Sequence, residues 1–170
     1  MNKSAFLQLS RKLSFDIEAT VLEDVTLAVD QPTEYFEKYE ERLEERGIDE
    51  PYEGMAWIAL VDVLLENDLA FEIDWKETGI YVCDVVDELI HRKKLPTFDW
   101  EKYEDEEYNE MPSDQFLNEI ANELRKVNLT LAHLDIDSDC YVLIVVPAAE
   151  WDEIKRWSEE AGVTVSNRFH

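Results

Sequence analysis

The sequence has few glycines, few cysteines and little positive charge. It contains 4 Gly and 2 Cys in 170 residues, and 16 Lys and Arg stand against 41 Asp and Glu, which gives a formal net charge of −25 at pH 7. A protein that binds nucleic acid needs a basic surface to meet the phosphates, so this balance excludes an ordinary nucleic-acid partner. It also disfavours attachment to an anionic membrane surface.

The shortage of glycine excludes the common phosphate-binding loops. Glycine occurs only at positions 47, 54, 79 and 162, so neither GxGxxG nor GxxxxGK[ST] can form. The nucleophile motif GxSxG and the zinc motif HExxH are also missing. The sequence therefore predicts no cofactor and no catalytic residue, and it favours a non-enzymatic protein over an enzyme.

The two cysteines and the short apolar runs bear on the compartment. Cys83 and Cys140 form no CxxC motif, and lone cysteines of this kind are typical of reduced core residues. The opening residues, MNKSAFLQLSRKLS, contain no apolar stretch long enough for a signal peptide. The longest apolar run, from Met55 to Leu65, is interrupted by Asp62 and is too short to cross a bilayer. We therefore expect a cytoplasmic protein.

Composition and periodicity predict one α+β domain over residues 1–170. Hydrophobic residues make up 45% of the chain, which is enough for a substantial core at this length. Helical periodicity covers residues 4–29, 54–67, 79–91 and 148–161, a helix capped by Thr33 ends at Gly47, and another is capped by Ser113. The helix at 54–67 is predicted to bury Leu60, Leu64, Trp57 and Val61 and to expose Asp62, Glu66, Met55 and Ala59.

The remaining patterns predict a small mixed or antiparallel sheet under these helices. Residues 69–75 alternate, with Leu69, Phe71, Ile73 and Trp75 on one face. Residues 129–136 and 140–146 form a hairpin, and the second of these strands is apolar enough that both its faces should be covered. A last strand at 163–166 follows the helix at 148–161. The C-terminal part is thus a β-hairpin, a helix and a strand.

An acidic segment rich in aromatic residues lies between Pro96 and Pro112. From Asp99 to Glu110 it carries seven acids against Lys102 alone, and we interpret it as a long surface loop with at most one helical turn. Aromatic residues are favoured at interface centres and acids steer a basic partner. A solvated acidic loop pinned by its aromatic residues would show the same pattern. The candidate contact residues are Trp100, Glu104, Asp105 and Tyr108.

Two groups of acidic residues suggest a metal site. Asp135, Asp137 and Asp139 resemble the start of a calcium loop, but Cys140 and Val146 stand where that loop needs Gly and Glu, and a turn explains the acids equally well. A second possible cluster joins two strands, if they are neighbours. Its four members are Glu72, Asp74, His133 and Asp135. A polar sheet face in solvent is the alternative to this metal site.

Three segments carry a resemblance to a known family. WIALVDVLLENDLAFEIDWKE (57–77), LDIDSDCYVLIVVP (134–147) and the helix that follows resemble a bacterial family of single-domain proteins described only as a domain of unknown function. That family has no assigned activity or cofactor, so the resemblance implies none. In size, acidity and layout the chain is also similar to the immunity proteins of bacterial toxin systems.

Two functions follow as expectations from these patterns. The first is a non-enzymatic acidic interaction protein that binds a basic protein partner, in the manner of an immunity protein or an inhibitor. The alternative is a metal-dependent hydrolase or metal-binding protein that uses Glu72, Asp74, His133 and Asp135. A solubility or halophilic adaptation would produce the same excess of acids as the first function. No pattern in the sequence indicates an oligomeric state.

Overall fold

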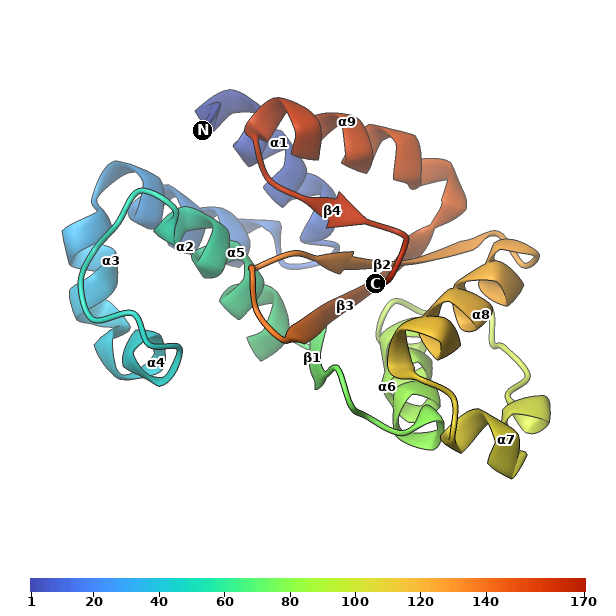
Figure 1. The fold of residues 1–170 in the computed structure, drawn as a ribbon. Helices are drawn as coiled ribbons and strands as arrows, with labels where there is room; N and C mark the ends of the chain where they lie inside the picture. Colours follow the sequence, from blue (N-terminus) through green and yellow to red (C-terminus); the bar gives the residue numbers. More distant parts are fainter.

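The computed structural model describes residues 1–170 and contains one four-stranded antiparallel sheet (Figure 1). Its strand order is β1-β3-β2-β4, and every neighbouring pair is antiparallel. The strands are β1 (Phe71–Asp74), β2 (Leu129–Leu134), β3 (Cys140–Pro147) and β4 (Val165–Ser166). The expected α+β fold is therefore confirmed, and the sheet is purely antiparallel.

Helices precede, interrupt and follow the strands. The N-terminal group is α1 (Lys3–Leu13), α2 (Glu18–Asp30), α3 (Pro32–Lys38), α4 (Glu40–Glu45) and α5 (Met55–Glu66). The later helices are α6 (Gly79–Arg92), α7 (Glu106–Asn109), α8 (Ser113–Arg125) and α9 (Trp151–Ala161), with short 3-10 turns η1 (Glu101–Glu104) and η2 (Ala148–Glu150). None of the helices combines the length and the apolar character that crossing a membrane requires.

Helices cover both faces of the sheet, as the apolar pattern of the third strand predicts. Side chains alternate along β3, so Val142 and Ile144 point to one side while Leu143 and Val145 point to the other. The first side belongs to a core shared with α1, α2, α5 and α9, and the second to a core shared with α6 and α8. Figure 1 shows these two groups of helices on opposite sides of the strands.

Local signals explain where several helices begin and end. Thr78 caps α6, where its side-chain oxygen accepts a hydrogen bond from the backbone N–H of Tyr81. Gly162 ends α9 in the left-handed conformation at φ 79°, which a glycine adopts without steric penalty. The predicted hairpin, the helix after it and the last short strand are all present, as β2, β3, α9 and β4.

Several predicted boundaries are wrong. The first helical stretch is two helices, because Phe15 at φ 50° turns the chain between them. Gln31, not Thr33, precedes the first turn of α3, in which Pro32 occupies the position that needs no N–H donor. Tyr39 then separates α3 from α4. Pro112 holds the cap position of α8, and Ser113 is its first residue.

The helix α5 is buried on nearly its whole circumference. All ten residues from 55 to 64 are buried, including Met55 and Ala59, which the sequence pattern placed outside. The carboxylate of Asp62, also expected outside, keeps only 3% of its surface exposed. A helix that is apolar all round has no preferred face in its sequence, so its neighbours α2, α4 and the sheet decide what it buries.

Candidate functional site

A groove opens beside the exposed indole of Trp75, where three turns of the chain meet. Residues 75–78 come from the turn after β1, residues 111–114 from the start of α8, and residues 138–141 from the β2–β3 hairpin. The cavity measures about 690 Å³, which lies within the size range of protein ligand pockets. Trp75 is 52% exposed. The ammonium of Lys76 lies 4.8 Å from the centre of its ring.

A second hollow of about 450 Å³ extends this groove along α7 and α8. The two cavities share Met111 and Pro112, which form an apolar step between them. We call the combined cavity the acidic groove. Six carboxylates line it, and Lys76 is the single Lys or Arg among its lining residues. The carboxylates are those of Glu77, Glu107, Glu110, Asp114, Glu119 and Asp139.

Hydrogen bonds between the three turns hold the acidic groove in shape. The hydroxyl of Ser113 donates to the carbonyl of Glu77 at 2.9 Å, which ties the start of α8 to the turn after β1. The backbone N–H of Trp75 donates to the carbonyl of Asp139 at 3.2 Å, which ties that turn to the hairpin. A groove with such cross-links is formed before a ligand arrives, so less ordering is needed on binding.

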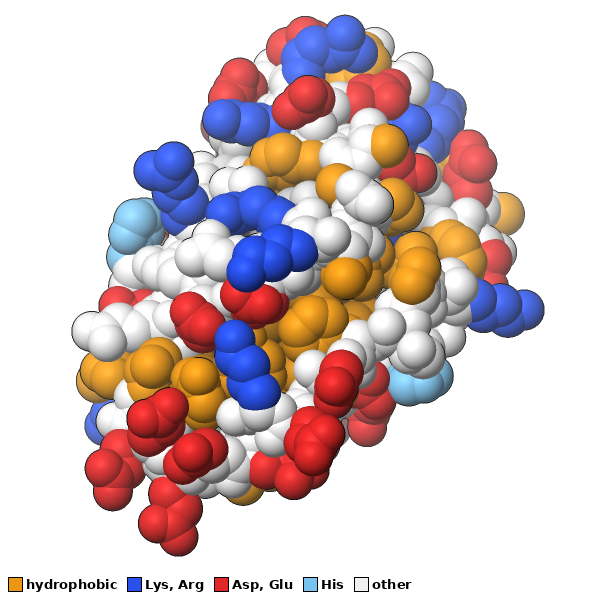
Figure 2. Space-filling view, turned by 90° about the vertical axis from the view of Figure 1, so that its right-hand side faces the viewer, with side chains coloured by type: hydrophobic (Ala, Val, Ile, Leu, Met, Phe, Trp, Pro, Cys, Tyr) orange, Lys and Arg blue, Asp and Glu red, His pale blue; other side chains and the backbone are white.

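Acidic side chains dominate this end of the molecule. Figure 2 shows them crowded at the lower end, at the level where Figure 1 places α7, with exposed hydrophobic side chains just above them. Of the 41 acidic residues in the chain, only ten form an ion pair with a Lys or Arg. Glu119 of the acidic groove is one of these ten, through Lys102, and the other five carboxylates of the groove have no Lys or Arg partner.

The four predicted contact residues divide into two exposed acids and two structural aromatic residues. Glu104 and Asp105 point to solvent. Trp100 is half-buried, and its indole N–H donates to the Asp87 carboxylate at 2.9 Å. Tyr108 is half-buried as well, and one side of it lines the acidic groove.

The aromatic side chains of the acidic segment form a packed cluster over α6 and α8. Tyr103 is fully buried, and its ring meets that of Phe116 edge to face with centroids 5.7 Å apart. Phe98, Trp100 and Tyr108 surround it. The segment contains two short helical elements, η1 and α7, where the sequence predicted one turn at most. The aromatic residues thus pin the segment, and its acids face outward.

The alternative metal cluster is not assembled, so that expectation is corrected. Strand β3 lies between β1 and β2, and the two strands therefore do not pair. Glu72 stands opposite Val142 and His133 opposite Leu143, so their side chains point to opposite faces of the sheet. Asp74 is the last residue of β1 and Asp135 directly follows β2, so both lie near the same end of the sheet, on strands that β3 separates. No three His, Cys, Asp or Glu side chains of the protein are grouped closely enough to hold a metal ion.

The three aspartates of the β2–β3 hairpin build its turn. The Asp135 carboxylate accepts a hydrogen bond from the backbone N–H of Asp137 at 2.8 Å, and Asp137 adopts a positive φ of 55°. The Ser138 hydroxyl accepts from the N–H of Cys140 at 3.2 Å. These are the local contacts that Asp and Ser make in tight turns. They explain Asp135 and Asp137 as turn formers.

His133 belongs to an aromatic clamp on the end of the chain. Its ring packs against those of Tyr141 and Phe169, with centroids 5.5 Å and 5.0 Å away, and those two rings also contact each other at 5.6 Å. Its Nε2 is 3.0 Å from the carbonyl of Arg168 and donates to it when it carries the proton. Burial lowers the pKa of His133 below its ordinary value. The folded protein therefore resists protonation of this ring.

We expect this histidine to make stability depend on pH. A His whose folded pKa is lowered binds fewer protons folded than unfolded, so its contribution to stability is lost as the pH falls through about 6.5, its unfolded pKa. The slope from one such group cannot exceed about 1.4 kcal/mol per pH unit. Urea unfolding of the wild type and of His133→Gln between about pH 7.5 and pH 5.5 measures the difference. Equal slopes in both proteins would contradict it, and His91→Gln, at an exposed site, is the control.

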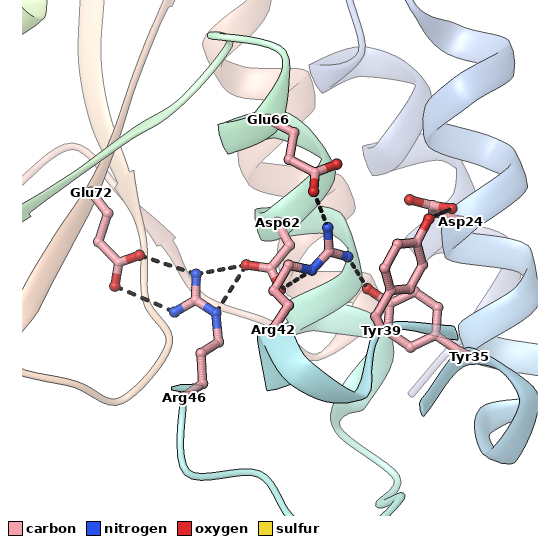
Figure 3. A network of polar contacts seen from close by, with 8 residues as sticks. All are labelled: Asp24, Tyr35, Tyr39, Arg42, Arg46, Asp62, Glu66 and Glu72. Atoms are coloured by element: carbon pink, nitrogen blue, oxygen red, sulfur yellow. Dashed lines mark hydrogen bonds and ion pairs between the residues drawn. The ribbon is translucent and has the colours of Figure 1, made fainter. Parts of the chain in front are cut away.

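A buried ionic network, which the sequence patterns did not reveal, fixes α4 against α5 and β1 (Figure 3). Arg46 donates to Asp62 at 2.6 Å and 2.9 Å and to Glu72 at 3.0 Å and 3.3 Å. Arg42 lies 3.3 Å from the second oxygen of Asp62, and it also contacts Glu66. Asp62 is therefore shared by two guanidinium groups.

The protonation preferences in this network follow from burial. Burial raises the pKa of the Asp62 carboxyl, and its two arginine partners lower the pKa by less. None of the residues of this network lines any of the larger cavities. We interpret it as a structural link between the N-terminal helices and the sheet.

The acidic groove has no sequence signal of its own. Trp75 was placed on the buried face of its strand by alternation, but β1 ends at Asp74, so Trp75 is in the following turn and the prediction for it is wrong. The other lining residues are scattered over three turns that are distant in sequence. The one available hint was an isolated aromatic residue next to a Lys and a Glu in a turn.

The chain was compared with protein families, curated proteins and solved structures. The model of a family described as "Domain of unknown function (DUF6630)" matches residues 5–169. No curated protein and no solved structure matches the chain. The match covers nearly the whole sequence, and it confirms the resemblance to a family without an assigned activity.

Proposed function

We propose that this chain, which belongs to the DUF6630 family of domains of unknown function, is a non-enzymatic interaction protein that binds a basic segment of a protein partner in the acidic groove. One observation carries the proposal: six carboxylates and a single lysine line a groove that also presents an exposed tryptophan. Opposite charge guides and orients a basic partner, and a tryptophan supplies the apolar contact at an interface centre.

The groove offers different contacts along its length. The indole of Trp75 and the step formed by Met111 and Pro112 suit an apolar side chain of the partner. Glu107 and Glu110 are exposed on one side of that step and suit Lys or Arg side chains that flank the apolar residue. Glu104 and Asp105 extend the negative charge beyond the groove, where they act on the rate of encounter more than on the final contact.

The sharpest form of this role is the neutralisation of a basic toxin, or the inhibition of a basic enzyme, in the cytoplasm of a bacterial cell. Such proteins act by covering a basic surface of the target and need no catalytic residue of their own. Both cysteines are free, which is compatible with a reducing compartment. Burial raises the pKa of the Cys83 thiol to about 12, and it also raises the pKa of the Cys140 thiol. Neither thiol is therefore activated as a nucleophile.

A basic model peptide tests the proposal before the natural partner is known. The probe is a short fluorescein-labelled peptide in which lysines and arginines flank a pair of leucines, and its binding is followed by fluorescence anisotropy. We expect saturable binding that weakens as the salt concentration rises from ~0.05 to ~0.3 M, because salt screens charges over about 8–10 Å. A matched peptide with glutamates in place of the basic residues is expected not to bind.

Variants locate the binding on the surface. Trp75→Ala is expected to lower the affinity for the peptide at least about tenfold, which is the loss typical of a central aromatic contact. Tyr52→Ala is the matched control, because Tyr52 is 45% exposed and lines none of the acidic groove. The double variant Glu107→Gln/Glu110→Gln is compared with Glu40→Gln/Glu41→Gln on α4. The proposal fails if Trp75→Ala and Glu107→Gln/Glu110→Gln each change the affinity no more than their controls do.

A further inference from the structure

A small basic hollow lies on another part of this acidic molecule. It measures about 280 Å³ and is bounded by the end of α1, the segment after α6 and the end of β3. Three cationic side chains line it, from Arg11, Lys12 and Lys93, and Glu150 is the single acid. The lining thus carries a formal charge of +2 in a chain whose net charge is −25. Phe15, Leu95 and Pro147 supply its apolar wall.

Lys93 is the unusual member of this set. Its ammonium donates to the carbonyl of Val145 at 3.0 Å. Strand β1 pairs with β3 only as far as Phe71 opposite Leu143, so Val145 lies beyond the end of β1 and the ammonium takes the place of a strand partner. None of the ion pairs of the protein includes Lys93.

The positive charge of Lys93 has no ion-pair partner and is offset only by the longer-range attraction of Glu150. Burial lowers its pKa to about 8, against an opposing effect of Glu150 and with a smaller lowering effect of Arg92, so the ammonium form still prevails at neutral pH. A half-buried ammonium with one hydrogen bond has two further N–H donors to satisfy. The hollow is the space that those donors can reach.

The other two cations have partial explanations. Arg11 and Lys12 stand in the last turn of α1, where positive charge is favourable. Lys12 forms an ion pair with Glu153 at 2.9 Å, and Nε of Arg11 lies 3.4 Å from a carboxylate oxygen of Glu18. Helix-end effects thus account for the positions of Arg11 and Lys12, and Lys93 also stands at a helix end, as the C-cap residue of α6. They do not explain why its ammonium is half-buried against the carbonyl of Val145.

We infer that this hollow binds a phosphoryl anion between Lys93 and Arg11, with the apolar wall in contact with an organic substituent of the same ligand. Guanidinium and ammonium groups are the usual donors to phosphate oxygens. The volume is slightly below that of most ligand pockets, about 300–1,000 Å³, which restricts the ligand to a small one. Lys12 adds positive charge at the edge of the hollow. Glu150 repels negative charge, so it disfavours ligands that carry more negative charge than the three cations can offset.

Titration of Lys93 itself is the direct test. The side-chain resonance of Lys93 is followed by NMR against pH in the full-length protein, in chloride, in inorganic phosphate and in phenyl phosphate at matched ionic strength. An anion next to the ammonium favours its charged form, so we expect the pKa of Lys93 to rise in phosphate relative to chloride. If phenyl phosphate produces the same rise at a lower concentration than inorganic phosphate, the apolar wall contributes and the ligand is a phosphate monoester. If both act at the same concentration, the apolar wall contributes nothing and the organic substituent is ruled out.

Thermal unfolding in the same solutions gives a second measurement. Phosphate stabilises many proteins without binding to a site, so the comparison is between variants. In Lys93→Met, phosphate is expected to raise the unfolding temperature by less than in the wild type. In Lys94→Met the full rise is expected, because Lys94 does not line the hollow. An unchanged pKa of Lys93 in both phosphates, or an equal rise in unfolding temperature in the two variants, would overturn the inference. The titration needs no variant, so it decides the matter even if Lys93→Met does not fold.

Discussion

Replacing Arg46 with methionine is expected to lower the free energy of unfolding by about 3 kcal/mol at neutral pH, the low end of the range for breaking a buried ion pair. Arg46 makes two hydrogen bonds to Asp62, a carboxylate that is only 3% exposed. In the variant that carboxylate keeps Arg42 as its one cationic neighbour. For a chain of this size, the loss corresponds to a fall in unfolding temperature of roughly 6–12 °C.

The same variant should recover stability in mild acid. Without Arg46, the pKa of Asp62, which burial already raises, rises further because a positive charge that lowers it is gone. A carboxyl with a higher pKa in the folded than in the unfolded state binds more protons when folded, so the deficit shrinks as the pH falls from about 7 to about 5. Denaturant unfolding at both pH values measures this change. A deficit that grows in acid would contradict the account of Asp62.

Two further variants separate the buried pair from its surroundings. Arg46→Met/Asp62→Leu removes both partners and is expected to be more stable than Arg46→Met alone, because the buried carboxylate of Asp62 is gone, while Glu72 loses Arg46 in both variants. Glu66→Gln is the surface control. Glu66 is 54% exposed, so its ion pair with Arg42 contributes less than about 1 kcal/mol.

Phe116→Ala is expected to lower the free energy of unfolding by about 4 kcal/mol, within the range for truncating a buried phenylalanine. Phe116 is 1% exposed and contacts both Tyr103 and Tyr108, so its removal leaves a cavity under the acidic segment. The segment from 98 to 110 should also become more accessible to protease, because these rings hold it on α6 and α8. Urea unfolding and limited proteolysis measure the two effects.

The controls for this variant come from the same cluster. Phe116→Leu retains most of the apolar volume and should cost less than half as much as Phe116→Ala. Tyr103→Phe removes a buried hydroxyl that has no hydrogen-bond partner, so it should leave stability unchanged or increase it. If Phe116→Ala leaves both stability and proteolysis unchanged, the aromatic cluster does not hold the acidic segment.

The fold could be predicted from the sequence because each of its layers has a strong local pattern. The apolar run from 140 to 146 required cover on both faces, and the structure supplies helices on both. Helix α6 was predicted within one residue, since its apolar residues repeat at helical spacing. The strand order could not be predicted, because β1 pairs with β3 across more than sixty residues of intervening chain and no local signal specifies that choice.

The functional features were less accessible to sequence analysis, because they depend on contacts between distant segments. Asp62 was expected to face solvent as an acid within an apolar helix, and its burial is compensated by Arg42 on α4 and by Arg46 just after α4. The interpretation of Trp100 as a contact residue remains a prediction, although its indole N–H is engaged with Asp87. Trp75 was assigned to the core because alternation was continued one residue past the end of β1.

The central claim, that the acidic groove binds a basic segment, is tested most directly by NMR mapping of the basic model peptide on the isotopically labelled full-length protein. The account predicts that the indole N–H of Trp75 and the backbone amides of Met111 and Ser113 shift most, and that they saturate together, while amides around Tyr52 stay in place. The indole N–H signal of Trp75 is assigned by its disappearance from the spectrum of Trp75→Ala. Small shifts spread evenly over all acidic faces, with Trp75 unaffected, would contradict the claim and reduce the charge to a general property of the surface.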